Sequence, residues 1–308
     1  MRRLALGRML VPAVLAAGCG ADTIQAPMPI AAPSLERSAA ALPSSYEYET
    51  FAVPGAILTT AQGINARGDI VGLFNDAGRR RHGFLLRNGQ FTTIDIRGAV
   101  STDARGIGPD GDIVGGYRRA GEPGVNIHGY LLTAQGDTMP VNYPGHTNTI
   151  PQRILPNGTI LGCRHDGDFM ATMRGIVMGR GGNEELDERA SMNNGATPDG
   201  RRIAGLYTDM TNRTAGFVVE DGVFTPFFVP GSNLTAAWDM NPAAQIAGVY
   251  RDAASRFHGF VRSGDDYATL DVPGAAATRA FGINARGTVV GSYVTGGVTR
   301  AFIATPAR

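Results

Sequence analysis

The chain has 308 residues, with 28 lysines and arginines against 27 aspartates and glutamates. This balance excludes the basic excess that draws proteins to nucleic acid or to anionic membrane surfaces. The 43 glycines and 18 prolines recur at fixed places, which indicates many tight turns and favours an all-β protein.

The first 18 residues have the pattern of a bacterial lipoprotein signal peptide. Met1-Arg2-Arg3 is positively charged, and the apolar stretch over residues 9–17 is too short to span a bilayer as a permanent helix. The segment Leu15–Cys19 (LAAGC) resembles a lipobox in which Cys19 carries the lipid, although Ala16 stands where that pattern prefers leucine. Gly20 after this cysteine resembles the class sorted to the outer membrane, on its periplasmic face or the cell surface. A plain secretory signal is the alternative.

Residues 19–45 are rich in alanine, proline and serine and show no apolar period of about 2 or 3.6 residues. They lack the means to bury a core, so the sequence predicts a disordered tether. Such a spacer holds a folded domain, residues 46–308, away from the lipid surface.

Residues 46–308 contain six copies of one repeat. Its clearest phrase is a turn, then two apolar or small residues, then a glycine. These glycines are 43, 47, 43, 43 and 43 positions apart. They are Gly72, Gly115, Gly162, Gly205, Gly248 and Gly291. The preceding segments, such as Thr197–Gly200 (TPDG), suit type I turns and predict that each joins two antiparallel strands.

Two further phrases recur in phase, a Gly-aromatic strand such as His82–Phe84 and a strand that ends at Pro-Gly such as Pro54-Gly55. Each unit therefore supplies four short strands, and six units predict a six-bladed β-propeller of four-stranded blades. The chain enters on Tyr46–Val53, the last strand type, and leaves on Ala301–Thr305, the preceding type. We expect the two ends to complete one blade together. An open β-solenoid is the alternative, but its usual period is shorter and its ends need caps.

These phrases resemble the HAF family of extracellular repeat proteins, whose unit reads roughly T-T-I-D-x-P-G-A, G-I-N-x-x-G-x-I-V-G and H-G-F. Phe91–Asp95, Gly63–Asn65, Gly282–Asn284 and His82–Phe84 match this unit. The resemblance covers nearly all of the mature chain and implies export and a repetitive β fold, without a common activity. Units three and four depart most, with Arg174-Gly175-Ile176 in place of His-Gly-Phe and Arg189-Ala190 in place of Pro-Gly.

Groups able to bind metal or transfer protons fall mostly at repeat positions. His82, His128 and His258 share one such position, so we expect each to bond a neighbouring turn or strand. Cys163 and His165 are competent metal ligands, but their spacing matches no established site, and a drifted blade with a buried thiol is favoured. We therefore predict no metal and no cofactor. Four carboxylates at one repeat position are interpreted as groups that fasten turns. Four methionines are interpreted as core filling of the divergent third unit. The carboxylates are Asp76, Asp166, Asp209 and Asp252, and the methionines are Met170, Met173, Met178 and Met192.

The position before each Gly-Ile-Asn segment changes chemistry from unit to unit, and the position after it is glycine in four of the six units. The candidate site residues at these positions are Gln62, Arg105, Gln152, Arg153, Asn194, Trp238, Asp239 and Phe281. At one end of the innermost strands they would form a ring at the mouth of the central channel. Aromatic faces with planar polar groups suit sugars or small polar ligands. The alternative is that these are surface residues under no constraint.

The sequence favours an exported, lipid-anchored binding or scaffold module for a small polar ligand, a glycan or a protein, which contacts the membrane only through its N-terminal lipid. It contains no Gly-x-Ser-x-Gly elbow, no phosphate-cradling loop with lysine and no His-x-x-x-His pair. The rival hypothesis is an enzyme that acts on carbohydrate or a lactone, with Arg105, Arg153, Trp238 and Asp239 around the channel. A third is a metal-supported site near Cys163 and His165.

Overall fold

The computed structural model describes residues 40–307, apart from 125, 180 and 187–189. The predicted signal peptide, Cys19 and most of the predicted tether lie outside these residues. No helix in the described ranges is long and apolar enough to cross a membrane.

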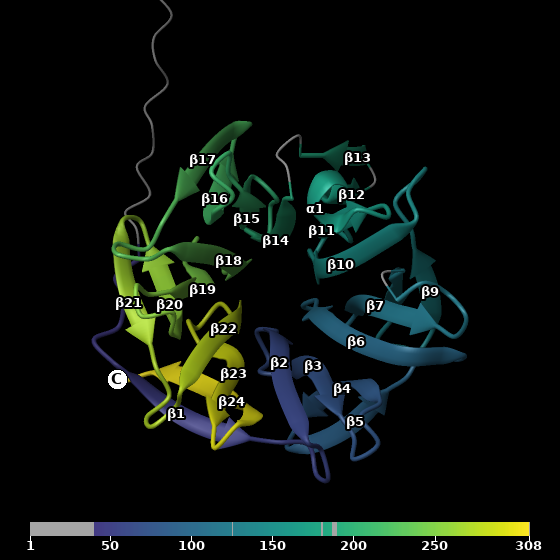
Figure 1. Ribbon diagram of the computed structural model, residues 1–308, viewed down its shortest axis with the longest axis horizontal. Helices are drawn as coiled ribbons and strands as arrows, with labels where there is room; N and C mark the ends of the chain where they lie inside the picture. Colours follow the sequence, from purple (N-terminus) through teal and green to yellow (C-terminus); the bar gives the residue numbers. More distant parts are fainter. Residues whose placement is uncertain (1–39, 125, 180, 187–189, 308) are drawn as a thin grey trace, which may run out of the picture. The chain divides into compact units, whose positions relative to one another are not determined.

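Six blades of four antiparallel strands surround a central axis (Figure 1), and the first two blades join into one eight-stranded sheet through a single parallel pair, Arg81 opposite Ser101. The innermost strands are β2 (Leu58–Ile64), β6 (Ala99–Ile107), β10 (Asn148–Ile154), β14 (Met192–Ala196), β18 (Leu234–Met240) and β22 (Ala277–Ile283). The second strands are β3 (Ile70–Asn75), β7 (Ile113–Arg119), β11 (Ile160–His165), β15 (Arg202–Thr208), β19 (Ile246–Arg251) and β23 (Val289–Thr295). The third strands are β4 (Arg81–Arg87), β8 (His128–Leu132), β12 (Arg174–Gly179), β16 (Thr214–Glu220), β20 (Phe257–Ser263) and β24 (Val298–Pro306). The outer strands are β5 (Gln90–Ile94), β9 (Thr138–Val141), β13 (Gly182–Glu185), β17 (Val223–Phe227), β21 (Asp266–Leu270) and β1 (Tyr46–Phe51).

The two ends of this domain share the last blade. Strand β1 pairs antiparallel with β24, from Tyr46 opposite Pro306 to Phe51 opposite Ala301. The N-terminal strand thus becomes the outer strand of the sixth blade, which closes the ring. The predicted six-bladed propeller and its strand-exchange closure are confirmed, and the open solenoid is wrong.

Every innermost strand contains a β-bulge at the same repeat position. In β2, Ala61 pairs with Gly72 and Gly63 pairs with Val71, so Gln62 is the extra residue. The same shift occurs in the other five innermost strands. We call the six extra residues the bulge residues: Gln62, Arg105, Gln152, Asn194, Trp238 and Phe281. A bulge bends its strand and re-aims the side chain that it carries, so the six variable positions have one backbone setting.

The repeat glycine of the second strand lies opposite the bulge of the innermost strand. Glycine is required at this position for a steric reason. A Cβ atom on Gly248 would lie 2.3 Å from the carbonyl oxygen of Ala236 and 2.5 Å from the ring of Phe260. The other five repeat glycines meet an innermost-strand carbonyl oxygen at 1.9–2.1 Å. Only glycine fits between the bulged strand and the third strand, which explains the spacing of about 43 residues in the sequence.

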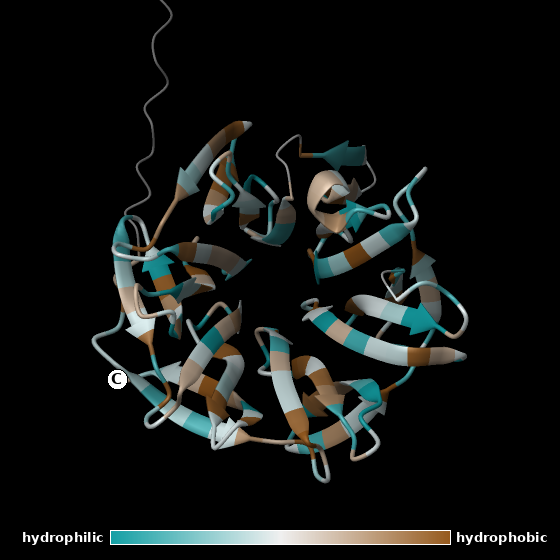
Figure 2. Cartoon of the chain, viewed as in Figure 1, coloured by the Kyte–Doolittle hydropathy of each residue, from teal (hydrophilic) through white to brown (hydrophobic). Residues whose placement is uncertain are grey.

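The core is distributed around the ring. The largest fully buried side chains include one from the third strand of each blade: Phe84, Tyr130, Ile176, Phe217, Phe260 and Phe302. Apolar clusters join adjacent blades, as where Val290 and Ala301 of the sixth blade pack with Ile64 and Phe84 of the first. Figure 2 shows hydrophobic positions in every blade. The blades therefore support one another laterally and hold the innermost strands in place.

Replacement of Gly248 by alanine tests the steric argument. The backbone carbonyl at 2.3 Å cannot rotate away, so we expect Gly248→Ala to lower the free energy of unfolding by about 3 kcal/mol. Gly167→Ala is the control, because a Cβ atom there meets nothing within 4 Å. Urea unfolding measures both variants. Equal stability of the two would contradict the account.

Candidate functional site

Four of the six bulge residues line the larger of two cavities on the channel. This wide cavity has a volume of about 500 Å³, and Gln62, Arg105, Trp238 and Phe281 contribute to its wall. The indole of Trp238 and the ring of Phe281 meet edge to face, with centroids 5.3 Å apart and planes at 87°. Such a pair is well packed and holds each ring in one orientation. The bulges thus present a fixed aromatic corner to the cavity.

The rest of the described wall is mostly apolar. It is supplied by the innermost, second and third strands: Leu73, Leu206, Leu234, Ala236, Val249 and Phe257. Thr208 and Thr214 add two hydroxyl groups. An apolar lining with a few converging polar groups is typical of small-molecule sites.

The divergent third unit contributes a helix to this wall. Where the first and fifth blades have a tight turn that begins at Asp76 or Asp252, the third blade inserts α1 (Phe169–Thr172) between β11 and β12. Asp168 caps α1 by accepting a hydrogen bond from the N–H of Ala171 at 3.1 Å. Phe169 and Met170 remain 39% and 48% exposed and line the cavity. This insertion makes the cavity asymmetric.

The interpretation of the methionines of this unit as core filling is correct only in part. Met173 and Met192 are buried in one cluster with Ile150 and Cys163, and Met178 is half-buried against a neighbouring cluster. For Met170 the interpretation was wrong, because α1 carries this side chain onto the cavity wall instead of into the blade. A four-residue helix has no apolar period long enough to be recognised in a sequence.

Cationic groups outnumber anionic ones in the described lining of the wide cavity, which contains Arg81, Arg105, Arg279 and Asp103. Asp103 accepts from Arg105 at 2.9 Å and lies 3.6 Å from Arg81. The guanidinium of Arg279 lies 4.3 Å from the centre of the Phe257 ring, and burial lowers its pKa from the ordinary value. Because Asp103 supplies the only carboxylate among the described residues of this lining, the wall carries a net positive charge.

We call the level of the residues that directly follow the bulges the throat of the channel. The throat is narrow because this residue is glycine in four blades. A Cβ atom on Gly106 would lie 2.4 Å from the carbonyl oxygen of Gln152, and one on Gly195 would lie 2.6 Å from the Cα atom of Asp239. A Cβ atom on Gly63 would lie 2.9 Å from the carbonyl oxygen of Arg105, and one on Gly282 would lie 3.1 Å from the Cα atom of Gly63. The remaining two blades place Arg153 and Asp239 at this level. The innermost strands therefore almost touch at the throat.

The guanidinium of Arg153 plugs this throat. It donates hydrogen bonds to the carbonyl oxygens of Gln62 at 3.0 Å, Arg105 at 2.9 Å and Phe281 at 2.5 Å. It also bonds the carbonyls of Gln152 and Trp238 at 2.7 and 3.3 Å. Five bulge residues, one from each of five blades, thus point their carbonyl oxygens at one cation. Backbone carbonyls that converge on an axis need such a donor, because unpaired buried acceptors are costly.

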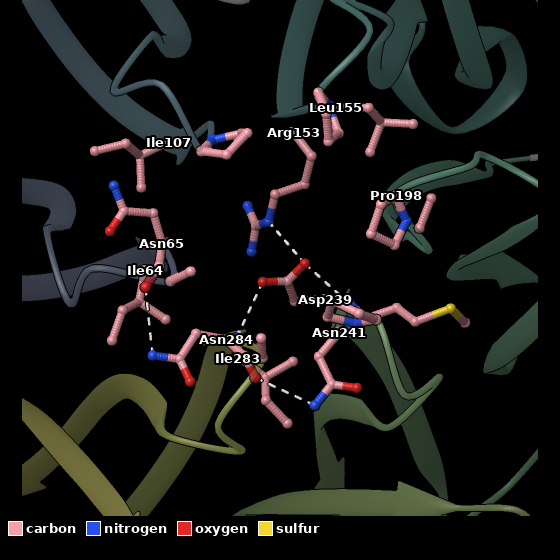
Figure 3. Close-up of a pocket in the computed structure, with 18 of the residues that line it drawn as sticks. Ile64, Asn65, Ile107, Arg153, Leu155, Pro198, Asp239, Asn241, Ile283 and Asn284 are labelled. Carbon is pink, nitrogen blue, oxygen red and sulfur yellow. Dashed lines mark hydrogen bonds and ion pairs between the residues drawn. The ribbon is translucent and has the colours of Figure 1, made fainter.

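Asp239 completes the plug. Its carboxylate lies 3.0 Å from Nε of Arg153 and accepts hydrogen bonds from the backbone N–H groups of Met240 and Ile283. Burial raises the pKa of Asp239, and the Arg153 guanidinium and the two N–H groups oppose that rise. Figure 3 shows Arg153 and Asp239 pointing toward each other across the second cavity.

This second, narrow cavity has a volume of about 150 Å³ and is lined by the turns that follow the innermost strands. Asn241 donates to the carbonyl of Asn284 at 3.1 Å, and Asn284 donates to that of Asn65 at 3.3 Å, which links three consecutive blades (Figure 3). Its polar groups are largely used in holding the turns and blades together.

The eight candidate residues therefore occupy three environments instead of one ring. Gln62, Arg105, Trp238 and Phe281 line the wide cavity, and Arg153 and Asp239 form the plug. Gln152 and Asn194 are buried and donate to Met192 Sδ and to the carbonyl of Ala237. Of the four residues named in the enzyme hypothesis, Arg105 and Trp238 line the wide cavity, whereas Arg153 and Asp239 line the second cavity.

The histidines have structural partners, as expected. His82 bridges Asp95 at 2.9 Å and Asp76 at 3.3 Å, and His258 bridges Asp271 and Asp252 in the same way. The pKa of Asp76 is lowered mainly by a hydrogen bond from the backbone N–H of Arg80, and the hydrogen bond with His82 lowers it further. His128 pairs with Glu122, and His146 with Asp166. These groups fasten turns to blades.

Cys163 and His165 lie within the third blade. Both are buried, and burial raises the pKa of the Cys163 thiol to about 12, so it is protonated at neutral pH. Nε2 of His165 has no hydrogen-bond partner among the described residues. No group of three or more histidine, cysteine, aspartate or glutamate side chains in the described part of the chain is placed to hold a metal ion.

Solved structures share the fold at low sequence identity. A protein assigned as TolB from Agrobacterium tumefaciens is 17% identical with a TM-score of 0.57, and the match covers 87% of this chain and all of that one. TolB from Acinetobacter baumannii is 13% identical with a TM-score of 0.54, over 82% of this chain and 65% of that one. The β-propeller domain of the Trilobed protease from Pyrococcus furiosus is 11% identical with a TM-score of 0.51, over 81% and 94%. This chain thus spans less than two thirds of the Acinetobacter protein.

No family model and no curated protein matches this sequence. The solved structures establish the class of fold, a β-propeller.

The plug is testable by a double-mutant cycle. Arg153→Met leaves Asp239 as an unpaired buried charge, so we expect a loss of about 3–5 kcal/mol in the free energy of unfolding. Adding Asp239→Asn removes that charge, so the double variant should lose less than the sum of the two single variants. Chemical unfolding of all four proteins measures the coupling. Additive losses would mean that the two side chains do not act as a pair.

Proposed function

We propose that this protein binds a small molecule in the wide cavity, as an exported and lipid-anchored propeller. The backbone of the six blades is uniform, whereas the side chains that line the wide cavity differ from blade to blade, and this contrast supports the proposal. The repeat glycine and the bulge recur in all six blades, whereas the bulge residues that reach the cavity are an amide, an arginine and two aromatic residues.

The size and build of the cavity support a small ligand. Sites for small molecules usually measure about 300–1,000 Å³, and this cavity measures about 500 Å³. Its aromatic corner is carried by strands whose backbone is fixed on both sides, by the repeat glycine and by the neighbouring blade. A rigid wall binds with little loss of conformational entropy.

The cavity also offers more than a general apolar surface. Gln62, Arg105 and Arg279 contribute amide and guanidinium groups around the Trp238–Phe281 corner. Planar polar groups beside aromatic faces give directional hydrogen bonds together with stacking. This combination favours a bound small molecule over a broad protein contact.

Location and family membership are part of the proposal. The charged start of the chain, its short apolar segment and the lipobox-like sequence before Cys19 favour export and lipid attachment in the outer membrane. The repeat phrases favour membership of the HAF family, whose members are extracellular. On this proposal the ligand comes from the periplasm or the surroundings of the cell.

A thermal-shift screen of the full chain against sugars, carboxylates and amides tests the function. A ligand at one hundred times its dissociation constant stabilises the fold by about 2.7 kcal/mol. We expect a ligand whose affinity falls at least about ten-fold in Trp238→Ala and in Phe281→Ala.

The matched control is Phe228→Ala, which removes an aromatic ring that lies outside the cavity and packs against Arg213. This variant should bind like the parent protein. The proposal fails if no compound stabilises the protein, or if a stabilising compound binds both cavity variants unchanged.

A further inference from the structure

We propose that the ligand is an organic monoanion: a carboxylate joined to a compact aromatic or aliphatic body. This inference rests on the proposed function and adds the chemical class. It follows from how the charges of the wide cavity are paired and from where its apolar groups lie.

Arg279 is the cation that needs a partner. It is half-buried, it lies over the ring of Phe257 at 4.3 Å, and no carboxylate in the described part of the chain pairs with it. It stands two residues before Phe281 on β22, and both side chains line the cavity. A partly desolvated guanidinium without a counter-ion favours an anion at its open side.

Arg105 supplies a second incompletely used guanidinium. One terminal nitrogen binds Asp103 at 2.9 Å, but its Nε is buried and has no partner among the described residues. Arg81 shares the same carboxylate at 3.6 Å. Asp103 is thus engaged by two arginines and cannot neutralise Arg279 as well. A guanidinium presents a planar fork that matches a carboxylate through two parallel hydrogen bonds.

The apolar groups require that the anion has a body. Trp238 and Phe281 form one side, and Phe169 and Met170 of α1 add another. A bare inorganic ion would leave these surfaces in contact with water, and a neutral sugar would leave Arg279 unpaired. An anion attached to an aromatic or aliphatic group uses both features at once.

The chain carries its own reporter for this test, because Trp238 is its only tryptophan. The full chain is titrated with 3-phenylpropionate, with the isosteric neutral amide 3-phenylpropionamide and with inorganic phosphate, while tryptophan emission is recorded. We expect the carboxylate to bind roughly ten-fold or more tightly than the amide, and phosphate to cause no saturable change.

Arg279→Gln should bring the affinity for the carboxylate to within about two-fold of that for the amide and leave the amide unchanged. Arg279→Lys, which keeps the charge without the fork, should retain part of the preference and serves if the first variant does not fold. Arg201→Gln is the matched control, because Arg201 is exposed and pairs with Asp221 outside the cavity. It should keep the full preference.

Equal binding of carboxylate and amide would overturn the anionic ligand and leave a cavity that binds small molecules. Saturable binding of phosphate at the affinity of the carboxylate would overturn the need for an apolar body. If neither aromatic probe binds while a neutral sugar stabilises the protein, the inference alone fails. If no compound of any class binds, the proposed function fails with it.

Discussion

One steric constraint organises this propeller, the contact between a glycine of the second strand and the bulged backbone of the innermost strand. In each blade a carbonyl oxygen of the innermost strand occupies the space of a Cβ atom at the repeat glycine. In most blades a buried aromatic ring from the third strand closes the opposite side. Because no larger residue fits, the bulge recurs at one level around the ring, and with it the direction of one side chain and one carbonyl group in every blade.

Two consequences follow at the centre of the molecule. The bulge carbonyls converge on the axis, where Arg153 binds five of them and Asp239 balances its charge, so the channel is closed at the throat. The bulge side chains are free to differ because the backbone does not depend on them. Gln62, Arg105, Trp238 and Phe281 use that freedom to line a cavity of about 500 Å³, and the framework supplies the rigidity that binding requires.

The repeat spacing was enough to predict the blade number, the strand order and the shared last blade, since each depends on a pattern that recurs six times. The candidate residues, which the sequence places in a single ring, instead occupy three environments in the structure. Adjacent residues of a strand face opposite ways, so Arg153 and Asp239, one position after the bulge, lie at the throat while Trp238 lines the wide cavity. The roles of α1 and Arg279 were missed because each occurs in one unit only, and a repeat pattern carries no information about its exceptions.

Trp238 stands on a bulge at the wall of an open cavity whose described charges are predominantly cationic. Collisional quenching of tryptophan fluorescence reports on this placement, because the full chain has no other tryptophan. At matched low ionic strength, we expect iodide to quench Trp238 more strongly than caesium, and neutral acrylamide to reach it as well. Equal quenching by the two ions, or protection from all three quenchers, would contradict the account.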